Sequence, residues 1–212
     1  METTYRTVGG EAQAAFTERR SRFIGTIRPV ISEEEALAFL QEKKKEAWDA
    51  THNVYAYCIR EGGVRRYSDD GEPQGTAGIP VLDVLQKNGL TDCAVVVTRY
   101  FGGILLGGGG LVRAYSHAAA LAVEAAGVRE MVLCDGLTIV CDYGQYGWAA
   151  PLIAAEGGLG LEAAYTDVVT LTFWLQVDRV SALQKKLTEA SAGRLSAAVG
   201  ERRFMPCSVA DR

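Results

Sequence analysis

Two segments of the sequence gather residues that could do chemistry, one of them acidic and the other rich in glycine. The first is SDDGEPQGTAG, from Ser68 to Gly78, and the second is RYFGGILLGGGGLVRAY, from Arg99 to Tyr115. The residues that we expect to form a binding site are Ser68, Asp69, Asp70, Glu72, Gln74, Gly75, Thr76, Arg99, Tyr100, Phe101, Gly102, Gly103, Gly107, Gly109, Gly110, Arg113 and Tyr115, with His52 and Tyr67 in secondary positions. We assign no catalytic residue among them.

Both segments stand immediately before a stretch that is typical of a helix. The start of a helix presents unpaired backbone N–H groups and a partial positive charge, and glycine lets a ligand approach the backbone, so each segment could hold a phosphate. Arg99 and Arg113 would add charge-assisted hydrogen bonds. Tyr100, Phe101 and Tyr115 would offer rings on which a nucleic-acid base could stack.

The same residues also have structural interpretations. Glycines before a helix often serve tight turns and close packing. Asp69, Asp70 and Glu72 could hold Mg²⁺, but acidic residues near a helix start more often cap the helix. His52 and His117 fit packed positions on a strand and a helix better than the role of a catalytic base. We therefore predict neither a metal site nor a cofactor.

The elements that must position these segments begin with two strands and a helix. Residues 10–30 alternate as strands around a turn near Arg20, with Phe23, Gly25 and Ile27 on one face. The following stretch, SEEEALAFLQEKKKEAW, is a helix whose capping box is Ser32 with the glutamate three residues later. We expect the side chains at positions 37, 40 and 47 of this helix to face inward.

The rest of the first domain is predicted from local composition and from the glycine and asparagine residues that end its elements. Residues 53–61 and 64–69 are typical of strands across a glycine turn, and a helix is expected from Thr76 to the Asn88-Gly89 stop. The run DCAVVVTRY predicts a central strand buried on both faces, and the alanine-rich residues 111–127 predict a helix. These elements complete a domain over residues 1–134.

The second domain, residues 135–212, shows the order strand, helix, strand, strand, helix, strand. This β-α-β-β-α-β order is the split βαβ pattern of ferredoxin-like domains, an antiparallel sheet with both helices on one face. Pro151 is expected in the first turn of its helix, where its missing N–H is harmless. The whole chain therefore belongs to the α+β class.

Composition excludes several classes of protein. Hydrophobic residues make up 48% and charged residues 23%, which are the values of a folded globular protein. The sequence contains no apolar run of the roughly 20 residues that span a bilayer and no signal peptide at its start, so we expect a cytoplasmic protein without a membrane partner. The net charge of −4 argues against binding nucleic acid by bulk positive charge, so any such contact must be local. The five cysteines are typical of buried thiols.

The pairing of SDDGEPQGTAGIPVLDVL with VVVTRYFGGILLGGGGLVRAYSHAA resembles the signature of the IMPACT family, whose members are also called YigZ-type proteins. The pattern is long and non-repetitive, running from Ala50-Thr51-His52 to Ala119, and the likeness to the bacterial members covers essentially the whole chain.

The resemblance implies the fold of each domain. The first would share the ribosomal-protein domain 2-like fold with elongation factor G domain IV and the GHMP kinases, and the second would be a ferredoxin-like domain similar to elongation factor G domain V. Because this pair of domains resembles the ribosome-facing end of a translation factor, it implies RNA or the ribosome as a partner. The eukaryotic members of the family regulate translation initiation. In two respects the chain departs from the family: Leu105 stands where many members have a lysine, and the 212 residues lack the extra N-terminal domain with which eukaryotic members bind a kinase activator.

Three functions compete at this stage. The first is a non-enzymatic nucleic-acid or ribosome binder, linked to regulation of translation. The second is a nucleotide- or phosphate-binding enzyme distantly like the GHMP kinases, but Leu111 and Val112 follow the glycines where those kinases have Ser or Thr. The third is a module that docks a protein partner. The sequence leaves the oligomeric state open, and all three functions require the acidic and glycine-rich segments to fold side by side.

Overall fold

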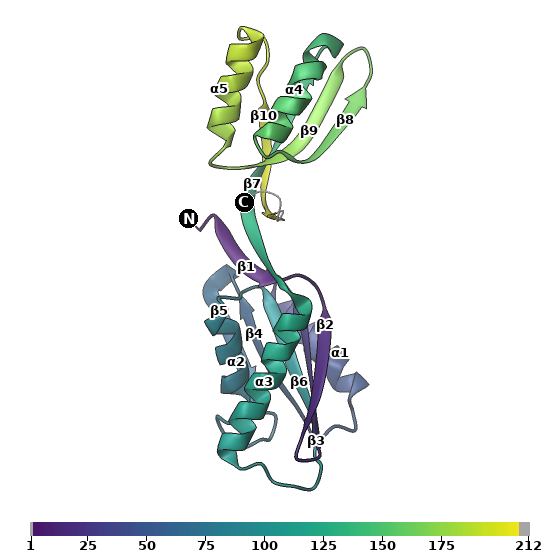
Figure 1. Ribbon diagram of the computed structural model, residues 1–212, viewed down its shortest axis with the longest axis vertical. Coiled ribbons are helices and arrows are strands. Elements are labelled where there is room, and N and C mark those ends of the chain that lie inside the picture. Colours follow the sequence, from purple (N-terminus) through teal and green to yellow (C-terminus); the bar gives the residue numbers. More distant parts are fainter. Residues whose placement is uncertain (1, 208–212) are drawn as a thin grey trace. The chain divides into compact units, whose positions relative to one another are not determined.

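A computed structural model of the chain describes residues 2–207, which divide into two compact units. The first unit is Tyr5–Glu130, and the second comprises the residues from Met131 on together with those up to Thr4 (Figure 1). The boundary that the sequence suggests, between residues 134 and 135, lies inside strand β7 (Val128–Cys141). The protein is an α+β protein whose two sheets are each five-stranded.

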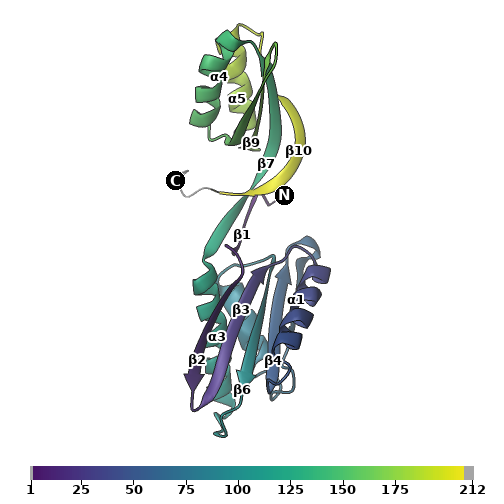
Figure 2. The same cartoon turned by 90° about the vertical axis from the view of Figure 1, so that its right-hand side faces the viewer.

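The first unit is a sheet with helices on both faces. Its elements are β2 (Ala12–Glu18), β3 (Ser21–Pro29), α1 (Glu33–Glu46), β4 (His52–Ile59), the 3-10 turn η1 (Glu61–Gly63), β5 (Val64–Ser68), α2 (Gly78–Lys87), β6 (Cys93–Tyr100) and α3 (Gly108–Ala126). The strands lie in the order β2-β3-β6-β4-β5, and each neighbouring pair is antiparallel. Helix α3 covers one face with α2 beside it, and α1 lies on the other (Figure 2).

Strand β6 is buried on both faces, which confirms its prediction as the central strand. Val95 and Val97 contribute to the core beneath α2 and α3, whereas Ala94 and Val96 contribute to the core beneath α1. This alternation follows from the two-residue repeat of a strand. It also fixes the direction of Arg99, which lies on the α2 and α3 side because it is two residues beyond Val97.

Helix α1 is rotated relative to the expectation. Ser32 caps it by accepting a hydrogen bond from the Glu35 N–H, and the Glu35 carboxylate accepts one from the Ile31 N–H. The buried positions are Ala36 and Phe39, so the prediction that Leu37 faces inward was wrong. Leu37 is 46% exposed. The aromatic ring of Phe39 provides the larger apolar contact with the sheet, so this side chain is buried in preference to that of Leu37.

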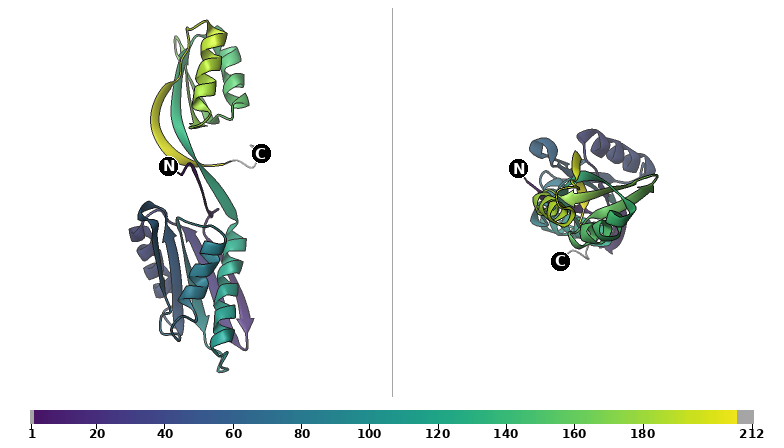
Figure 3. Two further views of the ribbon diagram at one scale, coloured as in Figure 1. Left: turned by 90° about the vertical axis from the view of Figure 1, so that its left-hand side faces the viewer. Right: turned by 90° about the horizontal axis from the view of Figure 1, so that it is seen from above.

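The second unit has the β-α-β-β-α-β order expected from the sequence. Its elements are β7, α4 (Tyr143–Ala155), β8 (Leu159–Tyr165), β9 (Val169–Gln176), α5 (Val180–Ser191) and β10 (Ala198–Pro206). Its sheet has the order β1-β7-β9-β8, with β10 also pairing with β7. Helices α4 and α5 lie on one face of this sheet (Figure 3, left). The leucines and isoleucine of strands β7 and β9 alternate inward to form its core.

Three features of the chain escaped prediction. Strand β1 (Thr4–Val8) is short and mostly polar, so its alternation gives no signal, although it joins the sheet through β7. Strand β7 starts eight residues earlier than the GLTIVCDY run that predicted it. Pro151 lies inside α4, not in its first turn, because Asp142 and Gln145 form a capping box that begins the helix at Tyr143.

The structure also bears on cysteine chemistry, membranes and metals. Cys58, Cys93, Cys134 and Cys141 are buried thiols, and burial raises the pKa of the Cys134 thiol to about 11. No helix within residues 2–207 has the length and apolar character of a membrane span. In the same range, no three His, Cys, Asp or Glu side chains converge as metal ligands would.

The contact between α3 and β3 is a test of this packing. A Cβ atom on Gly25 would lie 2.3 Å from the Ala118 carbonyl oxygen, whereas one on Gly10 would meet nothing within 4 Å. We expect Gly25→Ala to lower the free energy of unfolding by about 1–3 kcal/mol, because the helix must move away from the sheet. Gly10→Ala is the control, with a change within about 0.5 kcal/mol. Equal urea midpoints for the two variants would contradict the close approach.

Candidate functional site

The acidic and glycine-rich segments lie next to each other in the first unit. We call residues 68–77 the acidic loop and residues 101–110 the glycine-rich loop. The Arg99 side chain donates from Nη1 to Glu72 Oε1 over 2.5 Å, and the Tyr115 hydroxyl donates to the same oxygen over 2.6 Å. A Cβ atom on Gly108 would lie 3.8 Å from Thr76 Cγ2. One buried carboxylate thus ties the acidic loop to both β6 and α3.

The carboxylate of Glu72 is the centre of a buried polar cluster. The side chains of Glu72 and Arg99 are 4% and 6% exposed, and Tyr115 is fully buried. His52 places Nε2 3.8 Å from Glu72 Oε1, while its Nδ1 hydrogen-bonds the Asp70 carbonyl oxygen over 2.8 Å. The Arg99 guanidinium lies 5.4 Å from the ring centroid of Phe23 and 5.3 Å from that of Phe101.

This burial corrects the roles that we expected for Arg99 and Tyr115. A guanidinium that is paired inside the protein cannot also donate to a phosphate at the surface, and a fully buried ring cannot stack a base. The reason lies in the alternation of β6, which turns Arg99 toward the core, where a buried charge requires an opposite charge. Burial and the hydrogen bond to Glu72 raise the pKa of the Tyr115 hydroxyl far above its ordinary value.

The three carboxylates of the acidic loop have three different partners. Asp69 accepts hydrogen bonds from the backbone N–H groups at Gly75, Ala77 and Gly78, which fixes the loop at the start of α2. Asp70 accepts one from the Asn53 N–H over 2.6 Å. Glu72 pairs with Arg99, as described above. Because the carboxylates do not converge, the geometry gives no support to a Mg²⁺ site.

The other residues of the acidic loop shape its backbone. Thr76 donates from its hydroxyl to the Pro73 carbonyl, and Ser68 accepts from the Asp70 N–H. Gly75 has a φ of 76°, which favours glycine, and Gln74 is exposed. Tyr67 is partly exposed, and its ring packs so close to Gly78 that no larger residue fits there.

Four exposed arginines gather at the end of the first unit where the glycine-rich loop lies. Arg19 and Arg20 form the turn between β2 and β3, Arg22 follows on β3, and Arg113 lies in α3. Figure 1 shows this turn and the start of α3 at the same end of the unit. We call these residues the arginine end. Of the four, sequence reasoning found only Arg113, although the run ERRSR in a hairpin turn was a usable signal.

The turn and the glycine-rich loop are locked together. A Cβ atom on Gly102 would lie 2.1 Å from the backbone carbonyl of Arg20, so only glycine fits at this position. Arg19 donates to the Leu105 carbonyl over 3.4 Å, and the Gly102 N–H donates to Ser21 Oγ over 3.2 Å. These contacts hold the arginine side chains on a defined backbone.

The glycine-rich loop leads into α3 without a side-chain cap. Gly107 is the N-cap residue with a φ of 72°, and because glycine has no side chain it cannot accept hydrogen bonds from the first N–H groups of the helix. Gly109 and the half-buried Gly110 leave the backbone of the first turn accessible. Gly103 also has a positive φ, of 81°. The neighbouring Phe101 remains 44% exposed, and Tyr100 is partly exposed.

Helix α1 is held to the sheet by Arg28 of β3. The Arg28 guanidinium donates to both carboxylate oxygens of Glu42 over 2.9 and 2.7 Å and to Glu11 over 2.7 Å. It lies 4.5 Å from the ring centroid of Phe39. Hydrogen bonds from Arg28 and Lys43 lower the pKa of Glu42 to about 2.

The fold and these contacts define a two-unit α+β protein with a polar end built from loops. Several known proteins are similar to it in sequence. A family model described as the Impact N-terminal domain matches residues 19–123, and one described as a domain of unknown function (DUF1949) matches residues 139–194. IMPACT family member YvyE of Bacillus subtilis is 36% identical over 210 residues, which cover 99% of this chain and 97% of that protein. The chain belongs to the IMPACT family.

Two further likenesses extend over most of the chain. IMPACT family member YigZ of Escherichia coli is 33% identical over 180 residues, covering 84% of this chain and 88% of that protein. A solved structure described as the crystal structure of an hypothetical protein has a TM-score of 0.61 and 30% identity, and it matches 95% of this chain and 99% of that one. The resemblance read from residues 50–119 is thereby confirmed for both units.

Glu72 gives a first test of the site. In Glu72→Ala, Arg99 and Tyr115 lose their shared partner inside the protein, so we expect the free energy of unfolding to fall by about 3–5 kcal/mol. The double variant Glu72→Leu with Arg99→Met should lose less free energy of unfolding than Glu72→Leu or Arg99→Met alone, because neither charge is left buried without a partner. Urea denaturation measures all of these. As a control, Glu189→Ala, which breaks an exposed pair with Lys185, should change stability by under about 0.5 kcal/mol.

The pH dependence of stability tests the attachment of α1. Because the pKa of Glu42 falls from 4.5 to about 2 on folding, its charge stabilises the protein above pH 4.5, and this contribution is lost as the pH falls toward 2. Urea midpoints of Glu42→Gln should therefore lie below those of the wild type at pH 6 and converge with them near pH 2. Glu34→Gln, exposed on the same helix, should follow the wild type throughout. A gap for Glu42→Gln that persists at low pH would exclude this role.

Proposed function

We propose that this protein binds RNA, free or in the ribosome, through its arginine end, and that it acts in the regulation of translation without being an enzyme. The observation that carries the proposal is the Arg19-Arg20 turn. Both residues have positive φ, 45° and 66°, in a two-residue hairpin turn where glycine and asparagine are favoured. Arginine is thus disfavoured at both positions by the backbone conformation. Glycine or asparagine would fit the turn better but would lack the positive charge that arginine carries.

The chemistry of the arginine end suits a phosphate backbone. Exposed guanidinium groups form forked hydrogen bonds with phosphate oxygens. The uncapped start of α3 adds N–H donors and partial positive charge a short distance away. Phe101, at 44% exposure, supplies a ring for stacking. The local concentration of arginine overcomes the objection raised by the net charge of −4.

Membership of the IMPACT family supports a role in the regulation of translation. The IMPACT family includes eukaryotic proteins, and the resemblance implies that these regulate translation. It also implies that the first unit has the fold of elongation factor G domain IV and that the second is ferredoxin-like, similar to domain V. The β-α-β-β-α-β order of the second unit supports that assignment. A cytoplasmic location is part of this proposal, because ribosomes act there.

The competing functions receive less support from the contacts. A kinase-like enzyme would need carboxylates for Mg²⁺, and those of the acidic loop are engaged in holding the fold together. Docking of a protein partner on the same end is favoured by one observation, the exposure of Leu105 at 80% and Ile104 at 39%. The surrounding arginines make RNA the better match, because a local concentration of positive charge is complementary to a phosphate backbone.

Replacement of the turn tests the proposal and separates binding from stability. We expect Arg19→Asn with Arg20→Gly to raise the free energy of unfolding by about 1 kcal/mol, because the new residues tolerate positive φ. The same variant should weaken binding to a fluorescein-labelled oligoadenylate. Removal of each arginine that contacts phosphate should also lower the slope of log affinity against log salt by about 1.

Fluorescence anisotropy across about 50–200 mM salt measures both quantities. The matched control is Arg65→Ala, which removes an exposed arginine from strand β5 and should leave the affinity and the slope as they are. Unchanged affinity and slope in the turn variant would exclude the arginine end as the binding surface. Loss of binding to a captured protein, with RNA binding absent in the wild type, would favour the docking alternative.

A further inference from the structure

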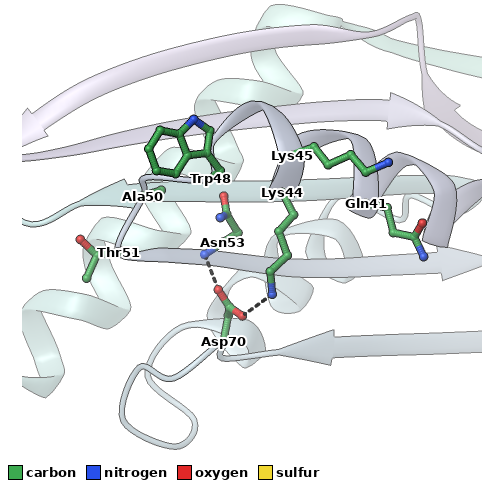
Figure 4. A pocket seen from close by; sticks show the side chains of 8 residues that line it. All are labelled: Gln41, Lys44, Lys45, Trp48, Ala50, Thr51, Asn53 and Asp70. Atoms are coloured by element: carbon green, nitrogen blue, oxygen red, sulfur yellow. Dashed lines mark hydrogen bonds and ion pairs between the residues drawn. The ribbon is translucent and has the colours of Figure 1, made fainter.

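A wide groove lies between the end of α1 and the start of β4. It has a volume of about 650 Å³ and is lined by Gln41, Lys44, Lys45, Trp48, Ala50, Thr51, Asn53 and Asp70 (Figure 4). The indole of Trp48 is 83% exposed, and it lies on one side of the groove with Lys44 and Asp70 on the other. Neither Trp48 nor either lysine belongs to a motif that the sequence marks as a binding site.

The position of Trp48 has no explanation in the core. Helix α1 ends when the Ala47 N–H donates to the Lys43 carbonyl, and the chain then turns toward β4. Trp48 stands in this turn and leaves most of its ring in solvent, although burying a ring of that size would stabilise the fold. A large exposed ring next to two lysines is the arrangement with which proteins stack a nucleic-acid base and hold its phosphate.

The groove is continuous with the glycine-rich loop. Thr51, in its lining, donates its N–H to the Arg99 carbonyl, and its hydroxyl accepts a hydrogen bond from the Phe101 N–H over 3.1 Å. Tyr100 donates its hydroxyl to Asp49 over 3.2 Å, next to Trp48 in the chain. These contacts place the groove beside the glycine-rich loop, so a strand bound at the arginine end would lie within reach of it.

Asp70 presents a carboxylate to the same space. Its backbone has a φ of 42°, and its carboxylate oxygen Oδ2 accepts the hydrogen bond from the Asn53 N–H. The other oxygen, Oδ1, forms an ion pair with the Lys44 ammonium over 3.6 Å, and its second lone pair can accept a further hydrogen bond. Ribose hydroxyls donate hydrogen bonds to carboxylates placed in this way, and DNA lacks the 2′-hydroxyl that would do so.

We propose that the groove holds one nucleotide of single-stranded RNA, an inference that rests on the proposed function and deepens it. The base stacks on Trp48, the phosphate lies against Lys44 and Lys45, and a ribose hydroxyl donates to Asp70. The volume falls in the range of small-molecule sites. A base must leave its helix to stack on a side chain, so the groove selects single strands over duplexes.

Stacking and phosphate contacts differ in their response to salt, and the test exploits this difference. In Trp48→Ala, the affinity for a fluorescein-labelled single-stranded oligoadenylate should fall by about fivefold to about a hundredfold, the range expected for loss of one stacked base. The slope of log affinity against log salt should stay at its wild-type value, because stacking releases no counterions. Ile31→Ala, which removes another exposed apolar side chain from the same unit, is the matched control.

Two further measurements identify the contacts. RNA should quench tryptophan emission in the wild type, and this quenching should disappear in Trp48→Ala, since the remaining tryptophans are Trp148 and Trp174 of the second unit. Asp70→Asn should lower the ratio of the affinity for oligoadenylate RNA to the affinity for the DNA of the same sequence. This variant keeps an oxygen for the Asn53 N–H and loses the second acceptor.

The outcomes separate this inference from the function beneath it. One outcome excludes the groove and keeps the arginine end as the binding surface. In that outcome the turn variant lowers the salt slope of RNA binding, and Trp48→Ala binds RNA with an affinity within twofold of the wild type's. If the wild type fails to bind RNA, both proposals are overturned. A loss of affinity in Trp48→Ala that Ile31→Ala reproduces would also exclude specific stacking.

Discussion

The first unit depends on one buried charge, that of Arg99. Because β6 is central and alternates between two cores, a charged residue at its end on the α2 and α3 side must find a partner inside the protein. Glu72 supplies that partner, and the contact draws the acidic loop onto β6, while Tyr115 brings α3 to the same oxygen. The acidic loop, strand β6 and helix α3 are thereby fixed together at one end of the unit, and the residues exposed there lie on a rigid backbone.

Buried and exposed residues at this end of the unit therefore have different roles. The residues with the strongest sequence signal, such as Asp69 and Glu72, hold loops and helix starts in place. The residues best placed to meet a ligand are less conspicuous in sequence: two arginines at positive φ and a tryptophan left in solvent. Both features are unfavourable for folding by themselves, and local strain or exposure of this kind concentrates where a surface has a function.

The sequence predicts much of the fold and only part of the site. The structure contains strand β6, helix α3 and the predicted order of elements in the second unit. Each of these is marked in the sequence by a strong apolar pattern or by residues that end helices and strands. Strand β1 escapes because it is only five residues long and mostly polar, so no alternation of apolar side chains marks it. The burial of Arg99 could have been anticipated from the alternation of DCAVVVTRY, but its partner could not, since a contact across 27 residues depends on loop geometry. The exposure of Trp48 has no sequence signal either, because this residue lies in the turn after α1, where helical spacing no longer assigns a face.

The most direct measurement of the central claim is amide chemical-shift mapping of the ¹⁵N-labelled protein during titration with single-stranded oligoadenylate. The account predicts shifts in the β2–β3 turn, the glycine-rich loop and the end of α1, with the resonances of α4 and α5 unmoved and the Arg99 side chain still paired. Shifts confined to the second unit, or none at saturating RNA, would contradict it.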